Sequence, residues 1–246
     1  ATIDPTGNVS IDAKLKADYT VVAVTAGFGF FVGIAGAVVV INDTSDVKAF
    51  IADASSAAGA VRILSANAVN INATRDVTIQ ASTAGAAAGL GAAVGAAVTL
   101  VNVGPETRHE TRAAIGNWTQ IGDSTQATPS VGDVSVVADS FISIDPVSGL
   151  DSTAVGIAIG TAAGSAGVAI VAINGDVEAE IGENADIINS GLVSVQALSG
   201  AEMAVSADGL AAGIAAVGVM VAQGNITGTT RARVRGGTRV RGGSLA

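Results

Sequence analysis

The stretch Gly132-Asp133-Val134-Ser135-Val136 recurs along the chain in four versions. The other versions are Gly7-Asn8-Val9-Ser10-Ile11, Gly59-Ala60-Val61-Arg62-Ile63 and Gly191-Leu192-Val193-Ser194-Val195. The copies begin 52, 73 and 59 residues apart. Repeats of this size bury their cores only by stacking on their neighbours. The pattern therefore predicts a repeat scaffold rather than a catalytic domain.

Apolar and polar residues alternate after these starting points, as in residues 9–15, which is the pattern of a half-buried β-strand. Of the 246 residues, 49% are hydrophobic but only 3% are aromatic, and 32 are glycine. A core without large rings must be thin and regular, because small side chains gain enough dispersion energy only in close contact. We therefore expect an all-β solenoid of about four imperfect repeats.

We expect residues 1–246 to form a single repeat domain, with units at 7–58, 59–131, 132–190 and 191–246. Turns are predicted where Asn, Asp and Gly cluster, as at Asn72-Ala73-Thr74 and Asn174-Gly175-Asp176. Residues 104–130 hold the only His and the only Trp and lack the strand pattern. We interpret this segment as an insertion loop between two coils.

Long uncharged runs of Gly, Ala and Val are the ambiguous part of the sequence. Residues 21–41, 84–101 and 154–173 are long and apolar enough for membrane helices, and they contain the G-x-x-x-G spacing of helices packed in lipid. However, each glycine costs a helix about 1 kcal/mol relative to alanine. The runs also contain pieces with a period of two, and no basic flank marks a cytoplasmic side before the final residues. Strands are favoured, and glycine-zipper membrane helices are the alternative.

As strands, these runs have one face of branched side chains and one face of nearly bare Ala and Gly. We expect the branched face to fill the interior and the Ala/Gly face to lie outside. A broad apolar surface marks a contact site, and one made of small residues lets another sheet approach closely. The sequence thus predicts self-association through flat Ala/Gly faces.

Catalytic and metal-binding patterns are missing from the sequence. With one His and no Cys, neither a His/Cys zinc cluster nor a Cys-His nucleophile can form. The one histidine, His109, lies in a polar segment and is expected to be solvated. No phosphate-binding loop, complete dinucleotide motif or calcium nonapeptide series occurs. We therefore expect a protein that is not an enzyme and that uses no cofactor or metal.

Five arginines crowd one segment of an otherwise acidic chain. The net charge is −9, and residues 1–230 alone carry −14, a balance that repels nucleic acid and anionic membranes. The candidates for an assembly contact are Arg231, Arg233, Arg235, Arg239 and Arg241. Because guanidinium groups pair well with carboxylates, we expect this basic end to meet the acidic body of a neighbouring subunit or repeat.

Five asparagines begin the N-x-[ST] pattern of N-glycosylation, which would be used in a secreted setting. These candidates are Asn8, Asn42, Asn72, Asn117 and Asn225. Asn and Thr are also common in turns and strands, and we favour that simpler interpretation of the pattern.

Three features recur in order: the Gly-x-Val-Ser-Val-x-Ala unit at 132–138, the Gly/Ala run that ends at Asn174, and the closing Ala-x-Ile-Gly at 179–182. Together they resemble the repeats of large bacterial filamentous adhesins of the leukotoxin-type and filamentous haemagglutinin-like group. The resemblance implies a right-handed β-helix that is exported to the cell surface for adhesion or matrix structure. The arginine-rich end departs from that pattern.

The leading hypothesis is a structural protein, extracellular or at the cell surface: a β-solenoid subunit or segment of a filament or adhesin. It would self-associate through its Ala/Gly faces and its complementary acidic and basic ends. The first alternative is an adhesin module that binds carbohydrate or a host surface, although one Trp and one Tyr offer little for sugar stacking. The second is the membrane oligomer of glycine-zipper helices. The expected partners are copies of the chain or adjacent repeats, with surface carbohydrate as a further candidate, and neither nucleic acid nor membrane.

Overall fold

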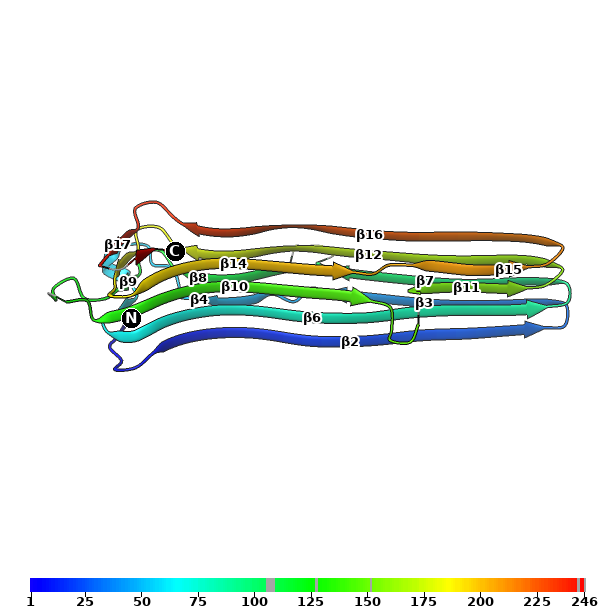
Figure 1. Cartoon of the computed structure of the whole chain (residues 1–246), viewed down its shortest axis with the longest axis horizontal. Coiled ribbons are helices and arrows are strands. Elements are labelled where there is room, and N and C mark those ends of the chain that lie inside the picture. The colour runs from blue at the N-terminus through cyan, green and yellow to red at the C-terminus, as the bar shows by residue number, and fades with distance from the viewer. Residues whose placement is uncertain (105–108, 127, 151, 243, 246) are drawn as a thin grey trace.

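The structure, a computed structural model, describes residues 1–104, 109–126, 128–150, 152–242 and 244–245. The described chain runs four times around one elongated circuit and begins a fifth (Figure 1). Each circuit has a short strand at one end of the molecule, a long path out to the opposite end, and a long path back. We call the end with the short strands the base and the opposite end the tip.

The circuits build three sheets in which every strand pair is parallel. The end sheet, at the base, consists of β1 (Thr2–Ile3), β5 (Arg62–Ile63), β9 (Gln120–Ile121), β13 (Asp186–Ile188) and β17 (Arg239–Arg241). The outgoing sheet consists of β2 (Val9–Gly29), β6 (Ala66–Gly89), β10 (Val131–Asp145), β11 (Ala154–Ile159), β14 (Leu192–Met203), β15 (Ala207–Ala212) and β18 (Ser244–Leu245). The return sheet consists of β3 (Val32–Asp43), β4 (Val47–Phe50), β7 (Ala92–Val103), β8 (His109–Ile115), β12 (Ala162–Ile181) and β16 (Ala215–Val234).

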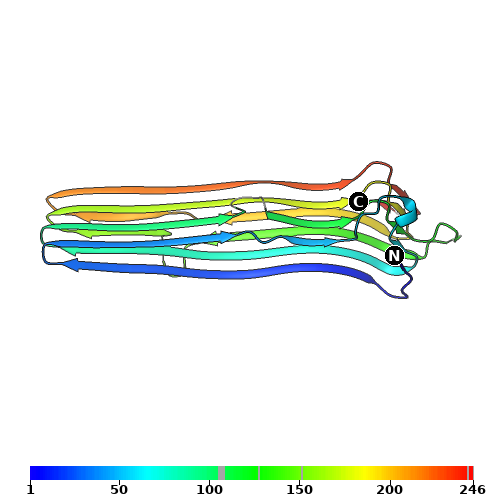
Figure 2. The ribbon, with the colours of Figure 1, turned by 180° about the vertical axis from the view of Figure 1, so that it is seen from behind.

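The two long sheets run side by side over the whole length of the molecule, and both chain ends lie at the base (Figure 2). The described residues contain one short 3-10 helix, Ala57–Gly59, and no α-helix. None of their helices could cross a membrane. The uncharged Gly/Ala runs are strands of the two long sheets, so the alternative of glycine-zipper membrane helices is wrong.

Equivalent residues of successive circuits pair directly, and this register corrects one copy of the repeated stretch. Val9 pairs with Val69, Val69 with Val134, and Val134 with Val193, so equivalent positions lie 60, 65 and 59 residues apart. The copy at Gly59 is wrong, because Arg62 belongs to the end sheet. Both kinds of strand alternate apolar and polar residues, so the pattern alone does not separate them. A repeated circuit has no natural starting point, and the four unit boundaries therefore stay a prediction.

The strands are longer than the sequence predicts. The expected turns at residues 72–74 and 174–176 lie inside β6 and β12. Asn72 extends outward from its strand, and its Nδ2 donates a hydrogen bond to Asp12 Oδ1 of the neighbouring circuit at 2.7 Å. In stacked circuits, an outward-facing side-chain amide can form a hydrogen bond with the equivalent position of the next circuit. Asn is therefore compatible with a strand here.

The predicted insertion loop at 104–130 is also largely wrong. It contains β8, which pairs with β12 and continues the return sheet, and β9 of the end sheet. Residues 105–108 and 127 of the predicted loop lie outside the described residues. Within this segment, the described residues that lie outside strands are 104, 116–119, 122–126 and 128–130. A second irregular stretch separates β10 from β11.

The core changes in character from the base to the tip. Near the base, Val and Ile from all three sheets fill a wide interior. Nearer the tip, the buried cluster consists only of alanines: Ala35, Ala87, Ala93, Ala158 and Ala163. A Cβ on Gly85 would overlap the carbonyl oxygen of Ala96 in the opposite sheet, so here the two backbones are in contact.

This close approach reverses the predicted assignment of faces. On β3, Gly33, Ala35 and Ala37 face the interior, whereas Ile34 and Val38 are exposed on the outside. The expectation of a branched interior and a bare Ala/Gly exterior is therefore wrong in the half of the molecule next to the tip. Two sheets this close leave room only for small side chains between them, and the branched ones must point outward.

Candidate interaction surfaces

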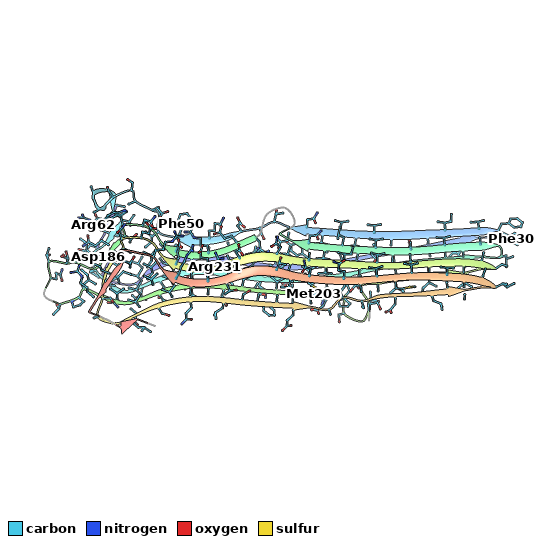
Figure 3. The ribbon with its side chains drawn as sticks, turned by 90° about the horizontal axis from the view of Figure 1, so that it is seen from above. Phe30, Phe50, Arg62, Asp186, Met203 and Arg231 are labelled. Carbon is cyan, nitrogen blue, oxygen red and sulfur yellow. The ribbon has the colours of Figure 1, made fainter. Side chains whose placement is uncertain are left out.

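The five C-terminal arginines lie near the base, on the last described circuit. Arg231 and Arg233 stand on β16, Arg235 follows it, and Arg239 and Arg241 belong to β17. Figure 3 shows Arg231 on the return sheet, with Arg62 and Asp186 farther toward the base. The five arginines lie directly beside three acidic residues of the preceding circuit, Glu178, Glu180 and Asp186, which we call the acidic row. In this register Arg231 pairs with Glu178, and Arg239 pairs with Asp186.

Glu180 is the centre of this charged ladder. It is 4% exposed, and its Oε1 accepts a hydrogen bond from Arg112 at 2.5 Å. Its Oε2 accepts bonds from Arg233 Nε at 2.9 Å and Arg235 Nε at 3.0 Å. Burial raises the pKa of Glu180, but the hydrogen bonds from its three arginine partners outweigh burial and hold the pKa below the ordinary value of 4.5.

The rest of the arginine row divides into paired and free groups. Arg233 also pairs with Glu178, and Arg241 Nη2 contacts both carboxylate oxygens of Asp186 at 2.6 and 2.9 Å. Arg231 and Arg239 have no side-chain partner within the described part of the chain. Three of the five arginines thus meet the acidic row of their own chain's preceding circuit, and a role in contacts between subunits stays a prediction.

We expect Glu180→Gln to lower the free energy of unfolding by about 2 kcal/mol at pH 7, because it leaves three guanidinium groups without their shared carboxylate. The folded-state pKa is depressed, so this stabilisation is present above about pH 4.5 and is lost as the pH falls through the folded-state pKa. Urea unfolding at several pH values measures the difference. Glu202→Gln, on an exposed carboxylate of β14, should change stability by less than about 0.5 kcal/mol. An unchanged difference between wild type and Glu180→Gln at pH 3 would contradict the assignment.

His109 is buried, contrary to the expectation that it is solvated. It is 3% exposed in β8, and a Cβ on Gly175 of the next circuit would overlap its imidazole ring. Gly175 thus makes room for the ring inside the stack. Burial, together with the positive charge of Arg75, lowers the pKa of His109 to about 4, so the imidazole is neutral at pH 7.

A second buried group is the ion pair between Arg75 and Asp43. Arg75 Nη2 lies 2.6 Å from Asp43 Oδ2, and the arginine side chain is fully buried. Arg75 Nη1 also donates to the carbonyl oxygen of Ser45 at 2.5 Å. This pair bridges the outgoing and return sheets where β3 gives way to β4.

The half of the molecule next to the tip exposes an extensive apolar surface. Between residues 19 and 42 of the first circuit there is no charged side chain. At the tip, Phe28, Phe30 and Phe31 are 72–81% exposed and Ile214 is 93% exposed. An open hollow of about 860 Å³ lies across the tip turns and is lined by Phe28, Phe30, Leu90, Ile159 and Ile214. Phe30 marks its position in Figure 3. This aromatic surface was not predicted from the sequence, although three of the five phenylalanines fall within residues 28–31.

Both ends of the stack are open. Among the described residues, β2 and β3 pair on one side only, and so does β16. Inward-facing Ile226 of the last circuit is 52% exposed, whereas its partner Ile173 is 3% exposed. At the other end Ile3 is 46% exposed and its partner Ile63 is 1% exposed. The interior of the stack therefore reaches solvent at both ends.

The candidate glycosylation sites lie at positions of differing access. Asn8, Asn42 and Asn225 are exposed, and Asn72 is partly buried. The side-chain oxygen of Asn117 accepts a hydrogen bond from the backbone N–H of Glu183 at 2.6 Å, which ties it to the neighbouring circuit. Use of the sequons stays a prediction.

No potential metal site made of three or more His, Asp and Glu side chains occurs within the residues that the structure covers. Of the acidic residues, Asp43 is bound to Arg75, and Asp46 to Lys48. No family model, no curated protein and no solved structure matches this chain.

Proposed function

We propose that this chain is a structural module of an extracellular filament or surface adhesin, folded as a right-handed β-solenoid. Its function in this proposal is to extend a stack of circuits by pairing its open ends with further circuits of the same design. The role is mechanical rather than catalytic. It agrees in kind with the adhesin resemblance of the repeated sequence.

The exposure of inward-facing side chains at both ends of the stack carries this proposal. Exposed strand edges and exposed core residues are liabilities that isolated proteins cover with charges, loops or helices. Here Ile226 and Val234 of the last circuit are exposed, while their partners Ile173 and Ile181 are buried. Pairing with a further circuit removes both liabilities at once.

A circuit of the same design fits this open end because equivalent positions are compatible. The register places Asn225 of the last circuit in the same column as Asn42 and Asn102. Asn102 Nδ2 already donates to Asn42 Oδ1 at 3.1 Å. Ala172 separates Asn102 from Asn225 in this column, and Asn42 of a following copy would make a second amide pair of the same kind with Asn225. The stack thus continues with contacts of a kind that the chain already makes.

Charge attraction contributes little to the proposed contact. In a head-to-tail stack, Arg231 would face Lys48 of the next copy, because both belong to the column of Arg112 and Glu178. Most of the other arginines are already paired within the chain. Backbone pairing and apolar burial therefore drive the proposed assembly, and the complementary charged ends of the sequence hypothesis are not needed.

The side surfaces suited to lateral association are the branched outer faces, in place of the interior Ala/Gly faces. Val38, Val94 and Val219 are exposed on the outer face of the return sheet, and Val94 lies beside its exposed register partner Ile34. Contiguous exposed apolar patches mark interaction sites. Filaments built from this module would therefore also associate sideways.

We expect the chain to self-associate with rising concentration, with little dependence on salt, as measured by sedimentation velocity. Ile226→Lys should reduce this association at least tenfold, because an inward-pointing charge on an edge strand blocks further pairing. Gln223→Lys is the matched control, since Gln223 lies on the outer face of the same strand. Equal association of the two variants, each checked for wild-type circular dichroism, would contradict stacking through this end.

One overlap in the proposed stack gives a second test of the same contact. β17 and β18 occupy the start of a fifth circuit, since Leu245 lies in the column of Val193 and Val9. In a head-to-tail stack, β17 and β18 of one copy and residues 2–9 of the next copy would compete for the same positions. Removal of residues 1–8 should therefore strengthen association, and weaker association of the shortened chain would contradict the head-to-tail arrangement.

A further inference from the structure

A groove on the outside of the end sheet combines the single tryptophan with unpaired arginines. It has a volume of about 470 Å³ and is lined by Trp118, Arg62, Gln120, Asn184, Asp186 and Arg239. This volume lies within the roughly 300–1,000 Å³ that is typical of small-molecule sites. Arg62, Gln120, Asp186 and Arg239 form one column across successive circuits, so the groove runs along the stack.

Trp118 occupies a backbone position that does not suit a bulky residue. Its φ is 59°, and the equivalent residues of the next two circuits are Asn184, with φ 55°, and Gly237, with φ 75°. Asn and Gly adopt this left-handed conformation most readily, whereas for a large residue it is an outlier. Residues in such strained backbone conformations cluster at ligand-binding sites, where the function of the side chain outweighs the cost of the strained turn.

The neighbours of Trp118 leave its ring accessible. The preceding circuit has Ala60 at the equivalent position, and the following circuits have Asn184 and Gly237. None of these residues is large enough to cover an indole ring, and all three belong to the groove lining or adjoin it. The ring is therefore available as a stacking platform.

The charges of the groove favour an anion. Arg62 and Arg239 have no side-chain partner within the described ranges, and Asp186 is already engaged by Arg241. In a chain of net charge −9 these free guanidinium groups form a local basic site. Guanidinium groups bind carboxylates through paired hydrogen bonds.

We propose that this groove binds an acidic oligosaccharide, with one sugar ring stacked on Trp118 and carboxylates held by Arg62 and Arg239. The amides of Gln120 and Asn184 supply donors and acceptors for sugar hydroxyl groups. The two arginines stand three circuits apart, about 14 Å at about 4.8 Å per strand. Each strand of a DNA duplex carries a phosphate about every 3.4 Å along the helix axis, a far denser charge than two guanidinium groups match. The site is independent of end-to-end assembly and goes beyond a mechanical role.

The single tryptophan makes the test direct, because its fluorescence reports on this groove alone. The probes are trigalacturonate, a sialylated trisaccharide and a hyaluronan tetrasaccharide, each compared with its methyl ester. We expect at least one acid to change the emission saturably and to bind at least tenfold more tightly than its uncharged ester. Equal binding of acid and ester, or no change of emission and no heat in calorimetry with any of the three acids, would overturn the proposal.

Four variants, one of them a control, locate the site. Arg62→Gln and Arg239→Gln should each weaken binding at least fivefold, and Arg231→Gln, which removes an unpaired arginine outside the groove, should leave it unchanged. Trp118→Asn should abolish calorimetric binding while keeping or raising the melting temperature, because the next circuit has Asn at this turn. A lower melting temperature with retained binding would assign Trp118 a structural role and overturn the site. Tighter binding of a single-stranded oligonucleotide than of any saccharide would overturn the proposed ligand class.

Discussion

Gly156→Val is expected to lower the free energy of unfolding by about 4 kcal/mol or more, or to prevent folding of the half next to the tip. A Cβ on Gly156 would overlap the carbonyl oxygen of Ala166 in the opposite sheet. Backbone atoms of two paired strands cannot move aside without breaking their ladders, so the side chain has nowhere to go. Gly85 and Gly209 occupy the same column. A Cβ on Gly85 would likewise overlap a backbone oxygen of the opposite sheet, that of Ala96, whereas a Cβ on Gly209 would first meet the flexible end of Met220. Denaturant unfolding followed by circular dichroism measures the effect.

Gly164→Val is the matched control in the same circuit. Gly164 lies on the outer face of β12, and a Cβ there would meet nothing within 4 Å. Its partners on the two sides are Val94 and Val217, so the substitution completes a row of valines. We expect a change between zero and about 1 kcal/mol of stabilisation. Similar losses for Gly156→Val and Gly164→Val would contradict the assignment of inner and outer faces.

Breaking the buried ion pair is the second large effect we expect. Arg75→Leu or Asp43→Val alone should cost about 3–5 kcal/mol, because each leaves one charge buried without its partner. The double variant should recover most of this loss. The neighbouring circuits support that expectation, since Leu15 is the partner of Arg75 in the outgoing sheet and Val103 is the partner of Asp43 in the return sheet.

A double-mutant cycle with urea unfolding separates the pair from its surroundings. The sum of the two single losses of unfolding free energy should exceed the loss in the double variant by several kcal/mol. Additive losses would mean that Arg75 and Asp43 act independently, for example through the bond from Arg75 to the carbonyl oxygen of Ser45.

The sequence predicted the strands well because period-two alternation is a local signal. Val9, Ile11 and Leu15 face inward as that pattern indicates, and the parallel β-class follows from repetition. The circuit length was harder to predict, because outward Asn72 is compatible with a stacked strand as well as with a turn. In the same way, Arg62 of the end sheet alternates with apolar residues just as the long strands do.

The inner and outer faces could not be predicted from alternation. Alternation of small and branched residues indicates that the two faces of a strand differ. The distance between the opposing sheets decides which of these faces lies inside. That distance is a property of the whole circuit, set by backbone contacts such as that between Gly85 and Ala96. The burial of His109 depends in the same way on Gly175, a residue of the next circuit.

The groove at the end sheet depends on register as well. Trp118 and Arg62 are 56 positions apart, and Arg239 is more distant still, so no local pattern connects them. Only the column of Arg62, Gln120, Asp186 and Arg239 brings them together. The left-handed turn at Trp118 becomes informative only when the equivalent turns at Asn184 and Gly237 are compared with it.

Electron cryomicroscopy of the concentrated protein tests most directly whether the open ends extend the stack. If they do, images show filaments whose strands run across the filament axis, with an axial spacing of about 4.8 Å between strands and about 19 Å for each four-circuit subunit. Single particles at every concentration, or filaments whose strands run along the axis, would contradict end-to-end stacking.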